Sequence, residues 1–185
     1  IGRATGRAFE DGAWDGRPQG LARSLKGLIL AALATREGHA NIFRPGQWPT
    51  VRRQIEQDGL VLPALENFFD GLARQGVLFV NAAWTHTRPS DVAAHLDLWK
   101  PTRKHFLSNL AEQDQPVVFL LLGEEAMKTF VDVEPLCNRS IIVMHAHPRS
   151  HQFFEFGQNP LVRANLGLQR LGAEPIQWWP PLFPA

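Results

Sequence analysis

The stretch Ile141-Ile142-Val143-Met144, followed by His145-Ala146-His147-Pro148, predicts a buried β-strand that ends at two imidazoles. Two further apolar runs predict strands of the same kind: Val77–Val80, which leads into Asn81, and Val117–Leu122. Apolar runs without polar alternation are typical of parallel strands. Ligands of open α/β sheets bind beyond the carboxyl ends of such strands, so we expect Asn81 and His147 to meet in one crevice. An amide and an imidazole there predict a site that reads a polar heterocycle and stabilises charge on it.

Helical patterns alternate with these strands and predict an α/β fold, in which a small central parallel sheet is flanked by helices on both faces. Apolar side chains recur at helical spacing in five stretches, at 25–33, 60–72, 98–110, 124–130 and 161–171. Ser24 precedes the first stretch and is expected to cap it. Segments 39–50 and 148–160 carry Gly, Pro and Asn and are expected to form loops, while the tail from Pro175 is expected to pack as an extended segment.

The chain has 185 residues, of which 44% are apolar, and this predicts one domain over residues 1–185 with a packed core. A sheet of three strands is small, so we expect one or more elements to precede Ile1. No apolar run of about 18 residues and no signal-peptide pattern is present, which predicts an intracellular protein, cytoplasmic or nuclear, without a membrane partner. The single Cys137 excludes an internal disulfide and a cysteine-pair zinc site and fits a reducing compartment.

Charge is distributed unevenly, although the formal net charge is only +1. Residues 1–53 hold nine Arg and Lys against four acids, and residues 54–185 hold ten against fourteen. A basic segment of this kind fits either a polyanion-binding surface or a solvated arginine-rich surface. On charge alone we favour the solvated surface.

Six segments follow one another along the chain: Gly6-Arg7-Ala8-Phe9, Ser24-Leu25-Lys26-Gly27-Leu28, residues 75–85 around Asn81, residues 117–123, His147-Pro148 and Pro175-Ile176-Gln177-Trp178. This ordered set resembles the uracil-DNA glycosylases, most of all the first family of that superfamily, and covers nearly the whole chain. The resemblance implies a DNA repair enzyme that flips uracil out of DNA and hydrolyses its N-glycosidic bond, leaving an abasic site. It implies a monomer that acts on uracil-containing DNA, single- or double-stranded, without a metal or another cofactor.

The resemblance also implies roles for three residues at the base pocket. Asn81 would hold the Watson–Crick edge of the flipped uracil, because an amide offers one acceptor and one donor that complement N3–H and O4. His147 would stabilise negative charge on uracil O2 as the bond breaks, and Phe9 would stack on the base. Without the resemblance, a strand-end turn would be the preferred explanation of Asn81, and a core anchor would explain Phe9 equally well. His145 is expected to be structural or to lie at the pocket edge, since no third ligand of suitable spacing completes a metal site.

Four residues are expected to face the DNA, namely Ser24, Arg149, His151 and Gln152. Ser24 matches a loop serine that contacts the DNA backbone. The other three follow His147-Pro148, where the family carries a leucine that wedges into the duplex. Because no leucine is present there, we expect altered handling of duplexes and a preference for single strands. The next two residues, Phe153 and Phe154, are expected in the core.

Two further departures from the family bear on function. Its first motif, which carries the aspartate that positions water and a tyrosine that excludes thymine, has no counterpart in residues 1–185, and neither Asp11 nor Asp15 is assigned that role. Its phosphate-gripping Gly-Ser loop reads Gly123-Glu124-Glu125, whose carboxylates would repel DNA but would favour the start of the following helix. Two alternatives therefore stay open. One is a non-catalytic DNA- or protein-binding module with this fold, and the other is a glycosylase with altered base preference.

Overall fold

The computed structural model describes residues 7–10, 21–57, 68–85, 87–113, 115–130, 139–155 and 157–179. Its sheet, within these ranges, consists of two parallel strands, β1 (Val117–Leu122) and β2 (Ser140–His145). Their register pairs Val117 with Ser140 and Leu122 with His145, so both strands end level with each other. The carboxyl ends of the sheet are thus occupied by Gly123 on one strand and by His145 and the residues after it on the other.

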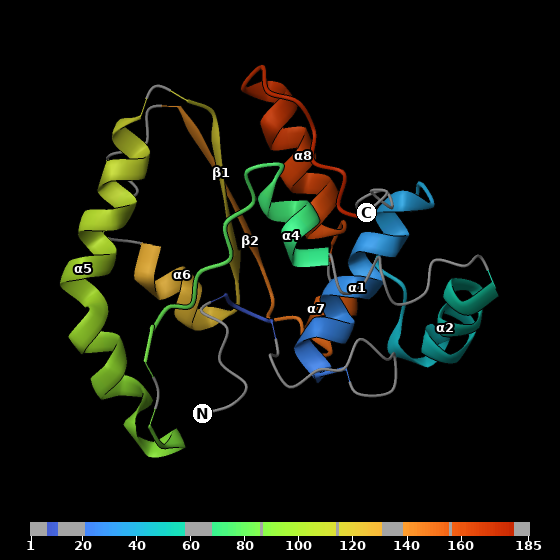
Figure 1. Ribbon diagram of the computed structural model, residues 1–185, viewed down its shortest axis with the longest axis horizontal. Coiled ribbons are helices and arrows are strands. Elements are labelled where there is room, and N and C mark those ends of the chain that lie inside the picture. The colour runs from blue at the N-terminus through green and yellow to red at the C-terminus, as the bar shows by residue number, and fades with distance from the viewer. Residues whose placement is uncertain are drawn as a thin grey trace.

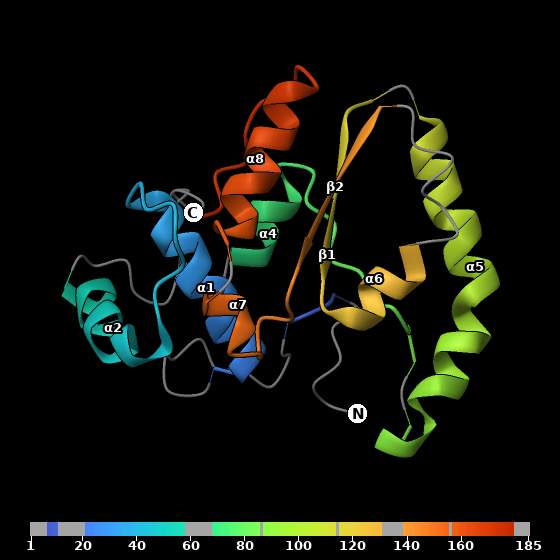
Figure 2. The same cartoon turned by 180° about the vertical axis from the view of Figure 1, so that it is seen from behind.

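Helices cover both faces of this sheet, as predicted, and their order is visible in Figure 1 and, from behind, in Figure 2. One face carries α5 and α6, and the other carries α1, α4, α7 and α8. The helices are α1 (Arg23–Arg36), α2 (Trp48–Gln57), α4 (Phe68–Ala73), α5 (Val92–Glu112), α6 (Glu124–Phe130), α7 (Gln152–Glu155) and α8 (Pro160–Arg170), with 3₁₀ turns at Pro45–Gln47 and Pro89–Asp91.

The alternation of side chains along β1 explains the two layers. Phe119 and Leu121 point toward α5 and α6 and form a cluster with Phe130. Val118 and Leu120 point the other way, against the larger core built around α1. Since both faces of the strand are covered by apolar side chains, β1 reads as an uninterrupted apolar run rather than an alternating one.

Helix α1 is the centre of the larger core. Every residue from Gly27 to Ala34 is buried, because α1 is enclosed by α4, α8 and the tail. The predicted cap is wrong: the helix begins at Arg23 after Ala22, whose carbonyl accepts the first intrahelical bond from Lys26 at 2.9 Å. Ser24 therefore lies within the first turn, and the Ala22 cap position makes no side-chain hydrogen bond.

Asn159 joins α8 to α1 and is completely buried. Its Nδ2 donates to the carbonyl of Ala31 at 2.8 Å and lies 3.1 Å from Thr35 Oγ1, and its Oδ1 accepts from Leu161 N at 3.0 Å. These bonds cap α8 and cross-link the two helices. The predicted loop at 148–160 is therefore too long, because it contains α7 and ends where Asn159 starts α8.

Other sequence-based boundaries also differ. The predicted loop at 39–50 ends early, because Gln47 Oε1 accepts from Arg44 N at 2.6 Å and a 3₁₀ turn leads into α2 at Trp48. Helix α5 is continuous across Pro101. Within the stretch 60–72, α4 is described from Phe68 onward, and residues 58–67 lie outside the described ranges.

The run Val77–Val80 does not form a sheet strand, and this prediction is wrong. Figure 1 shows the segment passing from α4 along the sheet toward α5, and a cavity of about 710 Å³ lies between it and β1. Near the middle of the run, the one backbone hydrogen bond in the described part of the chain is donated by Ala8 N–H to Phe79 O, at 3.4 Å. A strand needs a neighbour within hydrogen-bonding distance, which the cavity prevents. Leu78 therefore remains 62% exposed.

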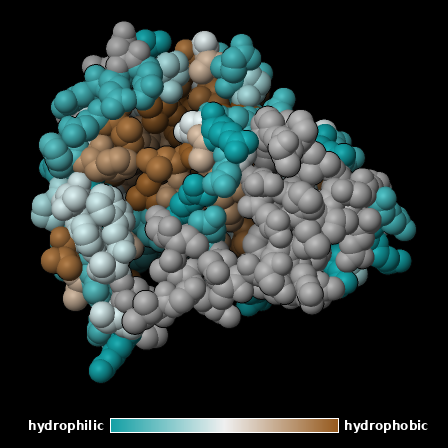
Figure 3. Space-filling view, in the orientation of Figure 1, coloured by the Kyte–Doolittle hydropathy of each residue, from teal (hydrophilic) through white to brown (hydrophobic). Residues whose placement is uncertain are grey.

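The cavity opens on the surface drawn in Figure 3, where hydrophobic side chains gather between α5 and α8. The tail closes the far side of the core: Gln177 N donates to Gln75 Oε1 at 2.8 Å, and Gln75 Nε2 returns a bond to Gln177 O at 3.1 Å. The predicted extended packing of the tail is confirmed as far as Trp179, and residues 180–185 lie outside the described ranges. In the described residues, no helix is both long and apolar enough to cross a membrane.

Candidate functional site

His147 lies just beyond the carboxyl end of β2, where it meets residues from two other elements. Its ring centroid is 5.7 Å from that of Phe9, at an interplanar angle of 51°. Beneath it lies Gly123, whose φ is +100° and whose backbone leaves room for the imidazole: a Cβ at position 123 would lie 3.0 Å from His147 Cβ. The structure therefore brings together the predicted stacking aromatic and the predicted catalytic histidine at the edge of the sheet.

The hydrogen bonds around His147 determine which ring nitrogen carries the proton. The backbone N–H of Arg149 donates to Nδ1 at 3.1 Å, so Nδ1 acts as an acceptor. In a neutral imidazole the other nitrogen is then the donor, which leaves an N–H on Nε2. Partial burial, and then the positive charge of Arg149, lower the pKa of His147 below its ordinary value of 6.5. The ring is therefore neutral at pH 7 and presents one N–H.

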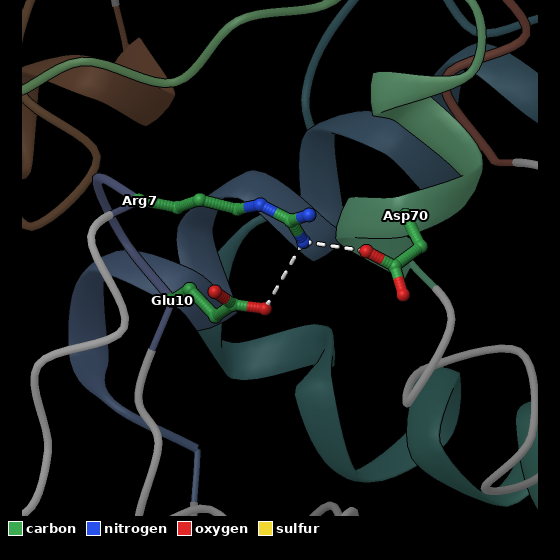
Figure 4. A network of polar contacts seen from close by, with 3 residues as sticks. All are labelled: Arg7, Glu10 and Asp70. Carbon is green, nitrogen blue, oxygen red and sulfur yellow. Dashed lines mark hydrogen bonds and ion pairs between the residues drawn. The ribbon is translucent and has the colours of Figure 1, made fainter.

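Phe9 reaches this position through an unusual backbone conformation. Its φ is +69°, in the left-handed region that costs an ordinary residue about 1–2 kcal/mol. The turn is held by Arg7, whose Nη1 lies 2.6 Å from Asp70 Oδ1 on α4 and 3.5 Å from Glu10 Oε1, as Figure 4 shows. The hydrogen bond to Asp70 also raises the pKa of Arg7. These contacts tie the start of the described chain to α4 and keep the Phe9 ring beside His147.

Asn81 lies at the rim of the large cavity, which Phe9 also lines. Its side chain is exposed and makes no hydrogen bond to any residue in the described ranges. Among the described residues, none competes with a ligand for this amide. The backbone that follows is held by Arg103 of α5, which is 8% exposed and donates from Nη1 to Ala82 O.

His145 is buried rather than placed in the crevice. Its Nε2 lies 3.0 Å from Phe153 O, and its ring packs edge-on against Phe153 at 5.1 Å between centroids. It thereby fixes the first turn of α7 against the end of β2. In the described ranges, no group of three His, Cys, Asp or Glu side chains is placed to hold a metal ion.

The chain is similar in sequence to known proteins over about three quarters of its length. No family model matches the chain. The chain is 30% identical over 141 residues to a uracil-DNA glycosylase of Enterococcus faecalis, covering 74% of the chain and 61% of that relative. It is 32% identical over 153 residues to a uracil-DNA glycosylase of Salmonella arizonae, covering 78% and 66%. The chain belongs to the uracil-DNA glycosylase superfamily.

The fold agrees with that of a superfamily member. A crystal structure of mimivirus UNG in complex with UGI matches 95% of this chain with a TM-score of 0.59 at 15% identity, and 61% of that chain is covered. The small parallel sheet with helices on both faces is thus the fold of this superfamily, as predicted. The chain spans about three fifths of the length of the first curated relatives that it matches.

Two of the four predicted DNA-facing residues line one pocket. Arg149 and His151 line a second pocket, of about 310 Å³, on the α1 side of the His147-Pro148 turn. Gln152 is exposed at the start of α7, where its N–H donates to Ser150 Oγ at 3.2 Å. Ser24 is half-buried and lies outside the pocket lining.

The acids after Gly123 share one lysine partner, which offsets part of their charge. Glu124 and Glu125 occupy the first turn of α6, as expected for carboxylates near a helix N-terminus, and lie 2.8 Å and 3.3 Å from Lys128 Nζ. The hydrogen bond from Lys128 lowers the pKa of Glu124. Phe153 is buried and Phe154 is half-buried against the main core, which confirms their predicted place.

Sequence reasoning missed two residues near the site. Arg103 orders the backbone after Asn81, and its signal was a single cation among the apolar positions of α5, near Trp99 and Phe106. Trp48 lines the second pocket beside Lys26, whose Nζ lies 5.3 Å from the indole centroid. Nothing in the sequence near Trp48 indicates that it lies close to Arg149, because the two are about a hundred positions apart.

Proposed function

We propose that this protein is a DNA repair glycosylase that hydrolyses the N-glycosidic bond of uracil in DNA and leaves an abasic site. The observation that carries the proposal is the neutral His147 ring, whose Nδ1 accepts the Arg149 N–H and whose Nε2–H is available beside Phe9. A base stacked on Phe9 lies next to this Nε2–H donor, which carries no formal charge.

Each residue contributes a separate step. Phe9 stacks on the extruded base, and Asn81 pairs with its Watson–Crick edge through an amide that no described residue uses. As the glycosidic bond breaks, negative charge develops on uracil O2, and the Nε2–H of His147 donates to it. A pre-positioned donor of this kind contributes about 2.7–4 kcal/mol to transition-state stabilisation. A neutral donor serves better than a cation that would bind the anionic backbone in the ground state.

The proposed partner is uracil-containing DNA, bound by an intracellular monomer. A preference for single strands follows from the segment after Pro148, which offers Arg149, Ser150 and His151 instead of an apolar wedge. The pairing of Glu124 and Glu125 with Lys128 supports DNA binding at this edge, because it reduces the repulsion that two free carboxylates would exert.

The proposal is tested with labelled single- and double-stranded oligonucleotides that carry one uracil, incubated with protein and then cleaved at abasic sites by alkali. We expect scission at uracil. Replacing His147 with Gln should lower the single-turnover rate about 10²–10³-fold. The matched control is His39→Gln, an exposed histidine just beyond α1, which should retain the wild-type rate.

Two results distinguish the alternatives. Binding of uracil DNA by folded wild-type protein without scission on any uracil substrate would refute the glycosylase and favour a binding module. Scission at a base other than uracil would reveal a glycosylase with altered base preference. Replacing Asn81 with Leu, which keeps the branched shape but removes the amide, should lower uracil excision about 5- to 150-fold, since an unmatched polar pair costs ~1–3 kcal/mol.

A further inference from the structure

The second pocket combines charge and aromatic surface in a way that the reaction at His147 does not use. It has a volume of about 310 Å³ and is formed by α1, the start of α2 and the turn after His147. Its floor is apolar and includes Leu30, Pro148 and Phe154. Its rim carries the cations Arg23, Lys26 and Arg149, and none of the described residues that line it is acidic. We call it the cationic pocket.

The charges of the cationic pocket are not neutralised within the described structure. Arg23, Lys26 and Arg149 form no ion pair with any residue in the described ranges, whereas Arg7, Arg36 and Lys128 each have a carboxylate partner. Like charges gathered on one rim repel each other, so an anion bound between them relieves that repulsion. The rim is therefore suited to a phosphate group.

Trp48 supplies the second half of the site. Its indole is half-buried in the pocket wall, and Lys26 Nζ lies 5.3 Å from the centre of the ring. A flat aromatic wall next to a cation is the arrangement with which proteins bind single-stranded nucleic acid, because the base stacks while the phosphate meets the charge. A base must be unpaired to stack in this way.

The cationic pocket is physically joined to the candidate catalytic residue. Pro148 forms part of its floor, and Arg149 lies on its rim while its N–H holds His147 Nδ1. Helix α1 packs so closely there that a Cβ on Gly27 would overlap the Pro148 carbonyl. A DNA strand whose base enters beside His147 therefore passes its neighbouring nucleotide over the cationic pocket.

We propose that the cationic pocket binds an unpaired nucleotide adjacent to the flipped base on the same DNA strand, with its phosphate held by Lys26, Arg23 and Arg149 and its base stacked on Trp48. This inference rests on the proposed function for the position of the flipped base. The preference for single strands then has two causes: the absence of the family's wedging leucine, and a pocket that binds an unpaired base.

The test measures binding of a fluorescent, uracil-free oligodeoxythymidine by anisotropy, so it does not depend on excision. Trp48→Ala should weaken binding roughly 5- to 150-fold, the range for loss of one base–aromatic stack. Trp48→Phe should retain most of the affinity because it keeps an aromatic face. Lys26→Ala should weaken binding and reduce the slope of log affinity against log salt by about 0.7, the single-strand value for one phosphate contact. Lys104→Ala, an exposed lysine on α5, is the matched control and should change neither.

The failures of the two proposals are distinguishable. If Trp48→Ala weakens oligodeoxythymidine binding while wild-type protein excises no uracil, the cationic pocket stands and the glycosylase proposal fails. If wild-type protein excises uracil but folded Trp48→Ala binds and excises from single strands like wild type, the cationic pocket proposal is refuted. A loss of affinity that is equal in Trp48→Phe and Trp48→Ala would also refute it, because stacking would then not be the cause. Thermal unfolding of each variant verifies that it is folded.

Discussion

Replacing Gly123 with Ala should damage the candidate site more than it damages the fold. The backbone at this position has φ of +100°, which costs a residue with a Cβ about 1–2 kcal/mol. The new methyl would also lie 3.0 Å from His147 Cβ and 3.3 Å from its Cδ2, tighter than ordinary van der Waals contact. The imidazole must therefore move by a few tenths of an ångström, together with the bond that Gly123 N donates to His145 O at 2.9 Å.

The matched control is Gly172→Ala, which separates the two effects. Gly172 has φ of +76° and nothing within 4 Å of a Cβ, so its replacement carries the backbone cost without touching the site. Both variants should lose about 1–2 kcal/mol of unfolding free energy in urea. Only Gly123→Ala should also lose excision, by about 10-fold, since a displacement of 1 Å at a catalytic group costs on the order of 10²-fold and the shift here is smaller.

The assay is single-turnover excision of uracil from a single-stranded oligonucleotide, measured at a temperature where both variants are fully folded. Equal excision rates for Gly123→Ala and Gly172→Ala, at equal stability, would refute the argument that Gly123 sets the position of His147. A large loss of excision in both variants would show that stability, not the local contact, limits activity.

Three further predictions follow from the same contacts. Partial burial and Arg149 lower the pKa of His147, so as the pH falls the unfolded chain binds a proton near pH 6.5, before the folded chain does. The stability of wild-type protein should therefore fall relative to that of His147→Gln as the pH drops below about 6.5. Excision should fall at still lower pH, as the imidazole of the folded protein ionises, and both quantities are measured across a pH series. Arg103→Met should leave the Ala82 carbonyl without its buried donor, which we expect to lower the free energy of unfolding by ~1–3 kcal/mol. It should also raise KM for uracil DNA, because the backbone that follows Asn81 is held less firmly. An unchanged KM would contradict this role of Arg103. Asp70→Asn should change the free energy of unfolding by no more than about 1 kcal/mol, because its ion pair with Arg7 is exposed. It should nevertheless weaken binding of uracil DNA, because the turn that carries Phe9 is no longer held. The control is Asp97→Asn, on the exposed face of α5.

The elements that the sequence predicted well are those whose burial is encoded in a continuous run of residues. Val117–Leu122 and Ile141–Met144 form β1 and β2, as the apolar runs predicted. Both faces of β1 are covered by apolar side chains, whereas Met144 near the end of β2 is 45% exposed. Val77–Val80 is an apolar run of the same kind but forms no strand in the described structure. Backbone pairing depends on an adjacent strand within hydrogen-bonding distance, which the run itself does not encode. Ser24 failed as a cap for a similar reason: the helix start is set by the conformation of Ala22, one of several positions that the local pattern allows.

The sequence by itself determined the residue types at the site, the strand that carries His147 and the α/β class, since these follow from local patterning and from an ordered set of motifs. Only the tertiary structure decided that Phe9 stands 5.7 Å from His147, that the Arg149 N–H leaves the proton on Nε2, and that Trp48 shares a pocket with Arg149. The physical reason is that a sequence pattern reports whether a residue is buried or exposed. It does not report which distant backbone or side chain will lie opposite once the chain has closed on itself.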